Sequence, residues 1–356
     1  MGNNSDVILE KILSKYVKKK TIYNGFLAVQ SRDERIDWSS AQSSTSQTFN
    51  SNDPFFIDSI TKMFTSAVVM NLRSQNKVEF DAGISNYLPE SLISGIHTFK
   101  KVDHVSEITV RHLLSHTSGL PDYFLQKQKD GKNLLDEITA EGDHNWDIQE
   151  VTRIARDELE PKFKPGKQGK AFYSDTNYQL LGAIIESVLD KSLEEAYNEV
   201  VFQPLSLEST YLFTPSSNDD QALIYNGKKR LDIPQAMASF WADGGIVSNT
   251  SDLLCFIRAF MDGELFPAEY LGEMMRWNKI FFPLEYGAGL MRFKLPRIMS
   301  PFSPTPELIG HSGSTGSFLF HSTNADLYIS GTINQIKEQG LPFRLMTEVV
   351  NILNKK

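Results

Sequence analysis

Two serine–lysine pairs with the same spacing are the first candidates for chemistry: Ser59 with Lys62, and Ser74 with Lys77. A serine hydroxyl is a weak nucleophile, and a lysine one helical turn away can help to activate it. An apolar run follows the first pair and predicts a buried helix, where an ammonium needs a partner or a lowered pKa. The second pair lies among polar residues and predicts a solvated helix end. Ser59 is therefore the candidate nucleophile.

Three further stretches fit an active site around such a serine. Tyr173-Ser174-Asp175 stands between a Gly/Pro loop and an amphipathic helix, and a tyrosine near a cation ionises more easily and can act as a base. The small residues of Gly310–Ser314 let the backbone lie against a substrate, and a following amide can donate to an oxyanion. Leu113–Pro121 is predicted to be structural support.

Taken together, these stretches resemble the serine β-lactamase / penicillin-binding-protein superfamily. The nearest branch is the class C β-lactamase-like one, with its esterases, D-aminopeptidases and D-Ala-D-Ala carboxypeptidases. Each stretch is a weak signal alone, but their order and spacing from about residue 20 to about residue 335 are specific. The matching pieces are Phe56–Thr65, Leu113–Pro121, Tyr173–Glu186, Gly244–Leu253 and His311–Gly313.

The resemblance implies a two-step acyl-enzyme mechanism without a metal or organic cofactor. Ser59 matches the acylated nucleophile, Lys62 its partner lysine and Tyr173 the tyrosine of the Tyr-x-Asn element. His311-Ser312-Gly313 matches the Lys-Thr-Gly or His-x-Gly strand. The oxyanion hole implied by the family consists of the N–H groups of Ser59 and Ser314, each contributing about 3–4 kcal/mol of barrier reduction.

Asp175 departs from the family, because it stands where asparagine is usual. An asparagine amide can donate a hydrogen bond, whereas an ionised aspartate only accepts. At about 4 Å from Lys62, and with an effective dielectric near 20, it would favour the ammonium by about 4 kcal/mol, or roughly three pKa units. Our hypothesis is that Lys62 stays charged, Tyr173 takes the serine proton, and Asp175 favours substrates with an amine. The alternative is a tolerated isostere that turns away from the site.

Two other positions depart from the family. His311 replaces the lysine of penicillin-recognising enzymes, and an unperturbed histidine is only about a quarter charged near pH 7. It would hold a substrate carboxylate weakly, which favours esters and amides over efficient β-lactam hydrolysis. Asp58 precedes the nucleophile where relatives usually have a small residue, and the sequence suggests only that it caps the helix.

Rival motifs fit less well. Gly310–Ser314 lacks the final glycine of a nucleophile elbow. His112 and His116 have helical spacing but lack the glutamate of a zinc protease. Residues 310–316 lack the Gly-Lys-Ser/Thr of a phosphate loop and precede a strand. The alternative from another functional class is a catalytically silent member of the same fold that binds or senses D-amino-acid peptides.

Composition limits the partners and the compartment. A net charge of −8 over 356 residues argues against nucleic-acid binding, so a small-molecule or peptide substrate is expected: a D-amino-acid derivative, an ester or a β-lactam. Cys255 is the only cysteine and excludes an intrachain disulfide. No apolar run approaches the 20 or so residues of a transmembrane helix. The start lacks an export signal, so the protein is either cytoplasmic or begins after a removed signal.

The sequence predicts an α/β (α+β) fold, with an antiparallel sheet flanked by helices. Residues 1–356 are expected to form one β-lactamase-like domain with two lobes. Residues of about 6–58 and 236–356 form the α/β lobe, residues of about 59–235 a mostly helical lobe, and the active site lies between them. Predicted helices are 6–20, 108–116, 180–189, 251–260 with Ser251 as N-cap, and 343–353; predicted strands are 23–30, 36–41, 286–293, 317–321 and 327–333.

Overall fold

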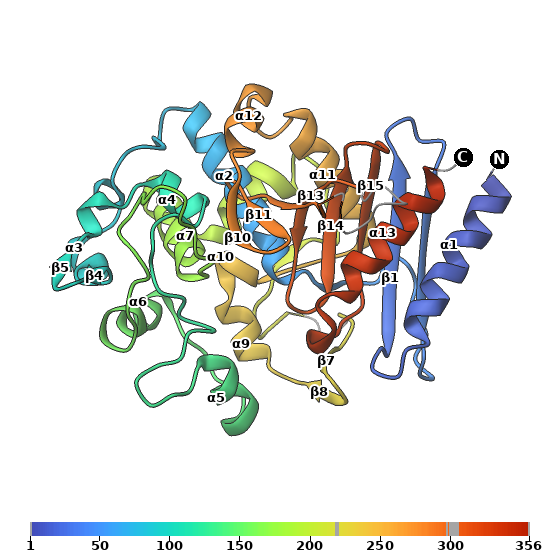
Figure 1. Ribbon diagram of the computed structural model, residues 1–356, viewed down its shortest axis with the longest axis horizontal. Coiled ribbons are helices and arrows are strands. Elements are labelled where there is room, and N and C mark those ends of the chain that lie inside the picture. Colours follow the sequence, from blue (N-terminus) through green and yellow to red (C-terminus); the bar gives the residue numbers. More distant parts are fainter. Residues whose placement is uncertain (1, 218–220, 297, 299–305, 355–356) are drawn as a thin grey trace.

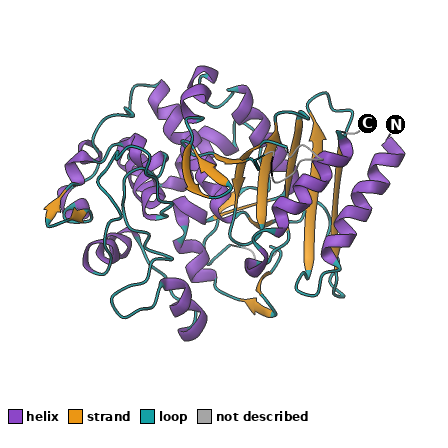
Figure 2. Ribbon diagram, viewed as in Figure 1, coloured by secondary structure: helices purple, strands orange, loops and turns teal. Residues whose placement is uncertain are grey.

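The computed structural model describes residues 2–217, 221–296, 298 and 306–354. Eight strands of the described residues form one antiparallel sheet, which extends from the centre of the molecule to the side where both chain ends lie (Figure 2). The strands are β1 (Asn24–Ser31), β2 (Asp37–Ser43), β10 (Asn278–Phe281), β11 (Leu284–Tyr286), β12 (Met291–Phe293), β13 (Leu308–Ser312), β14 (Ser317–Ser322) and β15 (Leu327–Thr332). Their order is β10-β11-β12-β13-β14-β15-β1-β2. Because β1 pairs with β15, both ends of the chain build the sheet, as predicted.

Helices cover both faces of this sheet (Figure 1). On one face lie α1 (Gly2–Val17) and α13 (Leu341–Leu353), where Phe343 packs against Phe320 of β14. On the other lies α11 (Thr250–Asp262), whose Thr250 carbonyl accepts a hydrogen bond from Ser330 of β15. Phe320 is paired with Ile329, the neighbour of Ser330, so the two contacts are on opposite faces.

The middle of the chain is mostly helical and lies beside the sheet in Figure 1. Its longest helices, α2 (Thr61–Ser74) and α7 (Thr176–Leu189), pack against each other and are largely buried. The remaining α-helices of the described residues are α3 (Glu90–Ile93), α4 (Val110–Leu114), α5 (Leu134–Glu141), α6 (Ile148–Asp157), α8 (Leu193–Tyr197), α9 (Pro234–Ser239), α10 (Trp241–Gly244) and α12 (Leu271–Met274). Over the described residues, no helix has the length and apolar character needed to cross a membrane.

Short strands complete the fold around the helices. They form a three-stranded sheet in the order β3-β9-β6 and two hairpins, β4–β5 and β7–β8. Their bounds are β3 (Phe55–Phe56), β4 (Thr98–Phe99), β5 (Val102–Asp103), β6 (Tyr211–Leu212), β7 (Ile224–Asn226), β8 (Lys229–Leu231) and β9 (Ile246–Ser248).

Two local predictions were wrong. Ser251 does not cap its helix, because the Asn249 side chain accepts from the Asp252 amide and α11 begins at Thr250. The predicted strand 286–293 is two strands, β11 and β12, separated by a turn. Gly289 in that turn has φ +75°, and a Cβ there would lie 2.0 Å from Ser66 Oγ of α2. The glycine therefore allows both the left-handed backbone and the close approach to α2.

Candidate active site

Ser59 and Lys62 meet where the chain enters α2. Ser59 lies in a 3₁₀ turn, Asp58–Ile60, and Lys62 lies in the first turn of the helix. The Lys62 ammonium donates to Ser59 Oγ at 3.0 Å, and the lysine side chain is 0% exposed. The second pair is different, since Ser74 and Lys77 are both exposed. Only the first pair has the buried setting that the sequence predicted.

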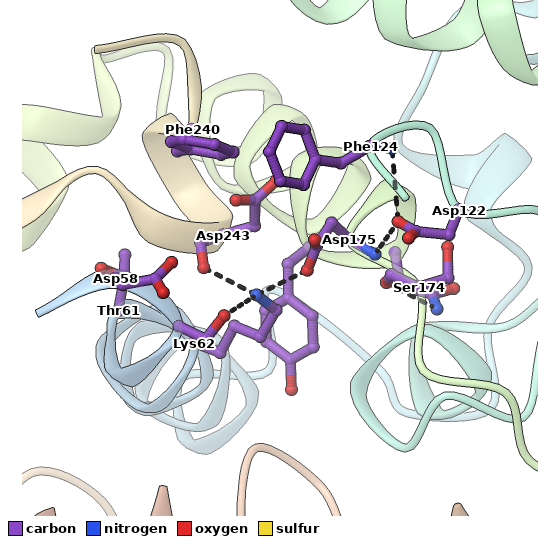
Figure 3. A network of polar contacts seen from close by, with 12 residues as sticks. Asp58, Thr61, Lys62, Asp122, Phe124, Ser174, Asp175, Phe240 and Asp243 are labelled. Carbon is purple, nitrogen blue, oxygen red and sulfur yellow. Dashed lines mark hydrogen bonds and ion pairs between the residues drawn. The ribbon is translucent and has the colours of Figure 1, made fainter. Parts of the chain in front are cut away.

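Lys62 is held between Asp175 and Asp243 (Figure 3). Its Nζ is 2.8 Å from Asp175 Oδ1 and donates to the Asp243 carbonyl at 2.7 Å. Burial by itself lowers the pKa of Lys62, but the neighbouring Asp175 carboxylate, with further contributions from Tyr173 and Asp243, outweighs this and raises the pKa well above its ordinary value. Lys62 is therefore a cation near neutral pH, and Asp175 faces the site rather than turning away.

Tyr173 completes the group around the serine. Ser59 and Lys62 are close enough to its hydroxyl for both to favour the phenolate, and Lys62 Nζ lies 5.2 Å from the centre of its ring. Burial raises the pKa of Tyr173, and the nearby Lys62 charge offsets this only in part. Both candidate bases, Lys62 and Tyr173, thus hold a proton in this state. Which of them accepts the proton of Ser59 remains a prediction.

The segment ending at Pro121 holds Tyr173 and Asp175 in place. His116 Nδ1 accepts from the Ser174 amide at 3.2 Å, and Ser174 Oγ donates to the Pro121 carbonyl at 2.9 Å. The Asp175 amide donates to Asp122 Oδ1 at 3.0 Å (Figure 3). These bonds fix the backbone at the start of α7, so the Asp175 side chain extends toward Lys62. The segment thus makes the supporting contacts that the sequence predicted.

His311 lies in β13 with its ring fully buried, 0% exposed. Its Nδ1 is 2.9 Å from the Ser312 carbonyl and its Nε2 is 3.0 Å from the Tyr286 hydroxyl. A carbonyl can only accept, so Nδ1 holds the ring proton, while the Tyr286 hydroxyl donates its own proton to the Tyr178 hydroxyl at 3.2 Å. Burial, helped by the Lys62 charge, lowers the pKa of His311 to about 3, so the ring is neutral. Ser312, Gly313 and the exposed Ser314 are more accessible, and their predicted substrate contacts remain predictions.

A cavity with about 890 Å³ of empty volume opens beside Ser59. One part of its wall, which we call the carboxylate side, contains Asp58, Asp175 and Asp243. A second part of the wall, which we call the apolar side, includes Phe124 and Phe240, whose rings pack edge to face beside Asp243 with centres 4.8 Å apart (Figure 3). None of the described residues lining the cavity is Lys, Arg or His. The apolar side of the cavity wall consists of Phe124, Leu125, Leu135, Ile138, Ile224, Leu231, Ile233, Met237, Phe240 and Ile336.

Comparison with known proteins identifies the family. A family model described as Beta-lactamase matches residues 9–344. The chain belongs to the β-lactamase family. This confirms the resemblance recognised in the sequence, and similar solved structures confirm the predicted fold class.

Other β-lactamase-family proteins are similar over much of the chain. A putative D-alanyl-D-alanine carboxypeptidase from Escherichia coli (strain K12) is 27% identical over 292 residues, covering 72% of this chain and 63% of that protein. The chain therefore spans less than two thirds of that relative's length. The D-stereospecific amidohydrolase from Streptomyces sp. has a TM-score of 0.74 at 23% identity, covering 93% and 94% of the two chains. The D-amino acid amidase from Ochrobactrum anthropi SV3 complexed with D-phenylalanine has 0.79 at 20% identity, covering 99% and 100%.

Sequence reasoning missed two buried carboxyl groups of this β-lactamase-family site. Asp243 Oδ2 accepts from Tyr123 at 2.9 Å and from Gln179 at 3.0 Å, and burial with the nearby Asp175 charge raises its pKa well above the ordinary value. Burial, together with Asp175, raises the pKa of Asp122 to about 7. Asp243 directly precedes a Gly-Gly pair that the sequence analysis had singled out, which is the one signal that could have indicated it.

Asp58 does not have the role suggested by the sequence. Ile60 is the N-cap residue of α2, and no side chain caps that end. The Asp58 carboxyl instead accepts from Ser314 Oγ at 2.7 Å and from the Thr315 amide at 3.0 Å. The expectation that Asp58 caps the helix was wrong, because its side chain reaches across to the turn after β13.

Proposed function

We propose that this protein is a serine hydrolase that cleaves amides of hydrophobic D-amino acids through an acyl-enzyme on Ser59. Esters of the same acyl groups are expected to react at the same serine. The observation that supports this most directly is the cavity, whose lining includes Ser59, the residues of the carboxylate side and those of the apolar side. A free α-ammonium suits the first side, and a bulky apolar side chain suits the second.

The charges around the cavity favour an amide over a substrate with a free carboxylate. Of the three carboxyl groups in the lining, Asp175 pairs with Lys62, whereas burial raises the pKa of Asp58 and of Asp243; no Lys, Arg or His is among the described lining residues. His311, which occupies the family's cation position, is buried and neutral. A peptide ending in D-alanine, or a β-lactam with its carboxylate, would find no counter-charge there. The D-stereospecific relatives support the D configuration of the substrate.

An ammonium bound at Asp175 would also assist the chemistry. Asp175 raises the pKa of Lys62 and of Tyr173, because an anion favours the ammonium and disfavours the phenolate. A substrate ammonium that neutralises Asp175 therefore lowers both pKa values. Once one of these two groups has released its proton to solvent, it takes the proton of the Ser59 hydroxyl as the oxygen attacks the carbonyl carbon. That proton then leaves on the departing ammonia. Water later attacks the acyl-enzyme and releases the acid.

A substrate panel tests the proposal. We expect kcat/KM to be highest for D-phenylalaninamide, at least about tenfold lower for 3-phenylpropionamide, which lacks the amine, and lower again for D-Ala-D-Ala and nitrocefin. Asp175→Asn should reduce the preference for the amine-bearing amide. Preference for nitrocefin or D-Ala-D-Ala, or an amine preference unchanged in Asp175→Asn, would contradict it.

The second candidate is a catalytically silent binder or sensor of D-amino-acid peptides. One observation favours it: in this state both Lys62 and Tyr173 retain their protons. Intact mass after incubation with a fluorophosphonate, with Ser59→Ala as control, separates the two candidates. The hydrolase predicts a single adduct that Ser59→Ala abolishes, whereas the silent binder predicts no adduct at Ser59.

A further inference from the structure

Two segments that are far apart in the sequence contact each other beside the candidate nucleophile, Ser59. The turn between β13 and β14 reaches residues 57–58, where Ser317 Oγ donates to the Ile57 carbonyl at 2.7 Å. Gly313 lies so close that a Cβ there would be 2.8 Å from the Asp58 Cβ and 2.9 Å from the Ile57 carbonyl oxygen. The turn therefore packs directly on the backbone that precedes Ser59.

The Asp58 carboxyl makes the remaining bonds of this junction. Its Oδ2 accepts from Ser314 Oγ at 2.7 Å and from the Thr315 amide at 3.0 Å. Asp58 is only 7% exposed, and its φ of +50° places it in the left-handed region that aspartate, asparagine and glycine tolerate best. Losing this acceptor would leave the buried Thr315 amide without its partner, which is costly.

The junction connects the two amides expected to form the oxyanion hole, those of Ser59 and Ser314. Ser59 follows Asp58 directly in the chain, and Ser314 is bound to Asp58 through its own hydroxyl. We propose that Asp58 is a positioning residue, whose Oδ2 holds the Ser314 turn against Ser59 so that both amides point at one oxyanion. This rests on the proposed role of Ser59 as nucleophile, but not on the identity of the substrate.

The proposal requires a hydrogen-bond acceptor at residue 58 but not a negative charge, so matched variants can separate the two properties. Asp58→Asn keeps a carbonyl oxygen able to accept both bonds and keeps the tolerance for a left-handed backbone. Asp58→Gly keeps the backbone conformation but removes the acceptor. Asp190→Gly is the control, because Asp190 has φ +53° and is exposed at the end of α7. Ser314→Ala removes one of the two bonds and retains the Ser314 amide.

Kinetics with a p-nitrophenyl ester, which has no amine, provides the first readout. We expect Asp58→Gly to lower kcat about 30- to 100-fold with KM changed less than about threefold, because misplacing an oxyanion donor acts on the transition state. Asp58→Asn and Asp190→Gly should remain within about threefold of the wild type, and Ser314→Ala should lose about three- to tenfold. An Asp58→Asn loss as large as that of Asp58→Gly, or a fully active Asp58→Gly, would overturn the proposal.

Amide hydrogen exchange of the peptide covering residues 313–317 provides a readout independent of activity. Exchange should accelerate in Asp58→Gly and stay near the wild-type rate in Asp58→Asn and Asp190→Gly. Equal exchange rates in all variants would contradict the claim that Asp58 holds the turn at residues 313–317 in place. If the wild type showed no hydrolysis and no Ser59 adduct while this exchange pattern held, the proposed function would fail and the junction would stand as a structural contact without a catalytic role.

Discussion

The carboxylate side and the apolar side of the cavity differ in what they bring to the same serine. The carboxylate side holds Lys62 as a cation at 2.8 Å from Asp175 and makes both candidate bases harder to deprotonate. The apolar side has no titratable group among its described residues and can recognise a ligand only by shape and burial. Changes on the first side should therefore alter rates and pH dependence, and changes on the second should alter which acyl groups bind.

The largest effect is expected from Lys62→Met, which removes the ion-pair partner of Asp175 on the carboxylate side. It removes the partner of Ser59 and leaves Asp175 without its counter-charge, so activity should fall at least about 10³-fold. Breaking a buried ion pair from one side should also lower the free energy of unfolding by about 3–5 kcal/mol. Ester hydrolysis and chemical denaturation measure the two effects.

Lys77→Met is the matched control for this substitution. It alters the second Ser-x-x-Lys pair, where Lys77 is exposed and Ser74 Oγ donates only to the Asn71 carbonyl of its own helix. Activity should be unchanged, and the free energy of unfolding should stay within about 0.5 kcal/mol of the wild type. Comparable activity losses in the two lysine variants would show that the buried setting of Lys62 is not what matters.

An intermediate effect is expected from Phe240→Ala on the apolar side. Phe240 packs on Phe124 and lines the cavity, so its loss removes contact area for a bulky acyl side chain. The kcat/KM for D-phenylalaninamide should fall about 10- to 100-fold, mainly through KM, while D-alaninamide should change less than about threefold. An equal loss for both amides would mean that the apolar side supports the fold without selecting the substrate.

The two sides also differ in how well the sequence could predict them. Ser59, Lys62, Tyr173 and Asp175 lie in short motifs whose spacing and order are visible in one chain, and the structure brings all four together. The apolar side is assembled from the loop at Phe124, α5, the β7–β8 hairpin, α9 and the 3₁₀ turn at Ile336. Its residues look like ordinary core residues in the sequence, because only the fold decides which of them face a cavity.

At single positions the sequence was incomplete or, for Asp58, misleading for a similar reason. The sequence shows that His311 replaces a lysine, but not that its ring is buried between Tyr286 and the Ser312 carbonyl, which settles its charge. Asp58 looks like a helix cap because it precedes a helix, and its actual partners, Ser314 and Thr315, lie far away in the chain. Burial and long-range partners are properties of the folded chain that local spacing does not contain.

The smallest effect, and the one that best separates charge from shape, is expected from Asp175→Asn. Removing the carboxylate withdraws a favourable interaction from the Lys62 ammonium and an unfavourable one from a Tyr173 phenolate, so the pKa of each group falls. The rate rises as one of these groups loses its proton, on the alkaline side of neutrality. The alkaline rise of kcat/KM for an amine-free ester should therefore move toward lower pH in Asp175→Asn, by about one unit or more.

The direction of this shift holds whichever group is the base, because Asp175 raises both pKa values. Phe240→Ala serves as the comparison and should leave the position of the alkaline rise unchanged, since it carries no charge. The substrate supplies a second check in kcat, which reports the enzyme–substrate complex: with D-phenylalaninamide, whose ammonium neutralises Asp175 once it is bound, the alkaline rise of kcat in the wild type should lie at lower pH than with 3-phenylpropionamide. A shift toward higher pH in Asp175→Asn would mean that Asp175 does not set the charge of the Lys62–Tyr173 pair. In that case the carboxylate side, like the apolar side, would act only through shape.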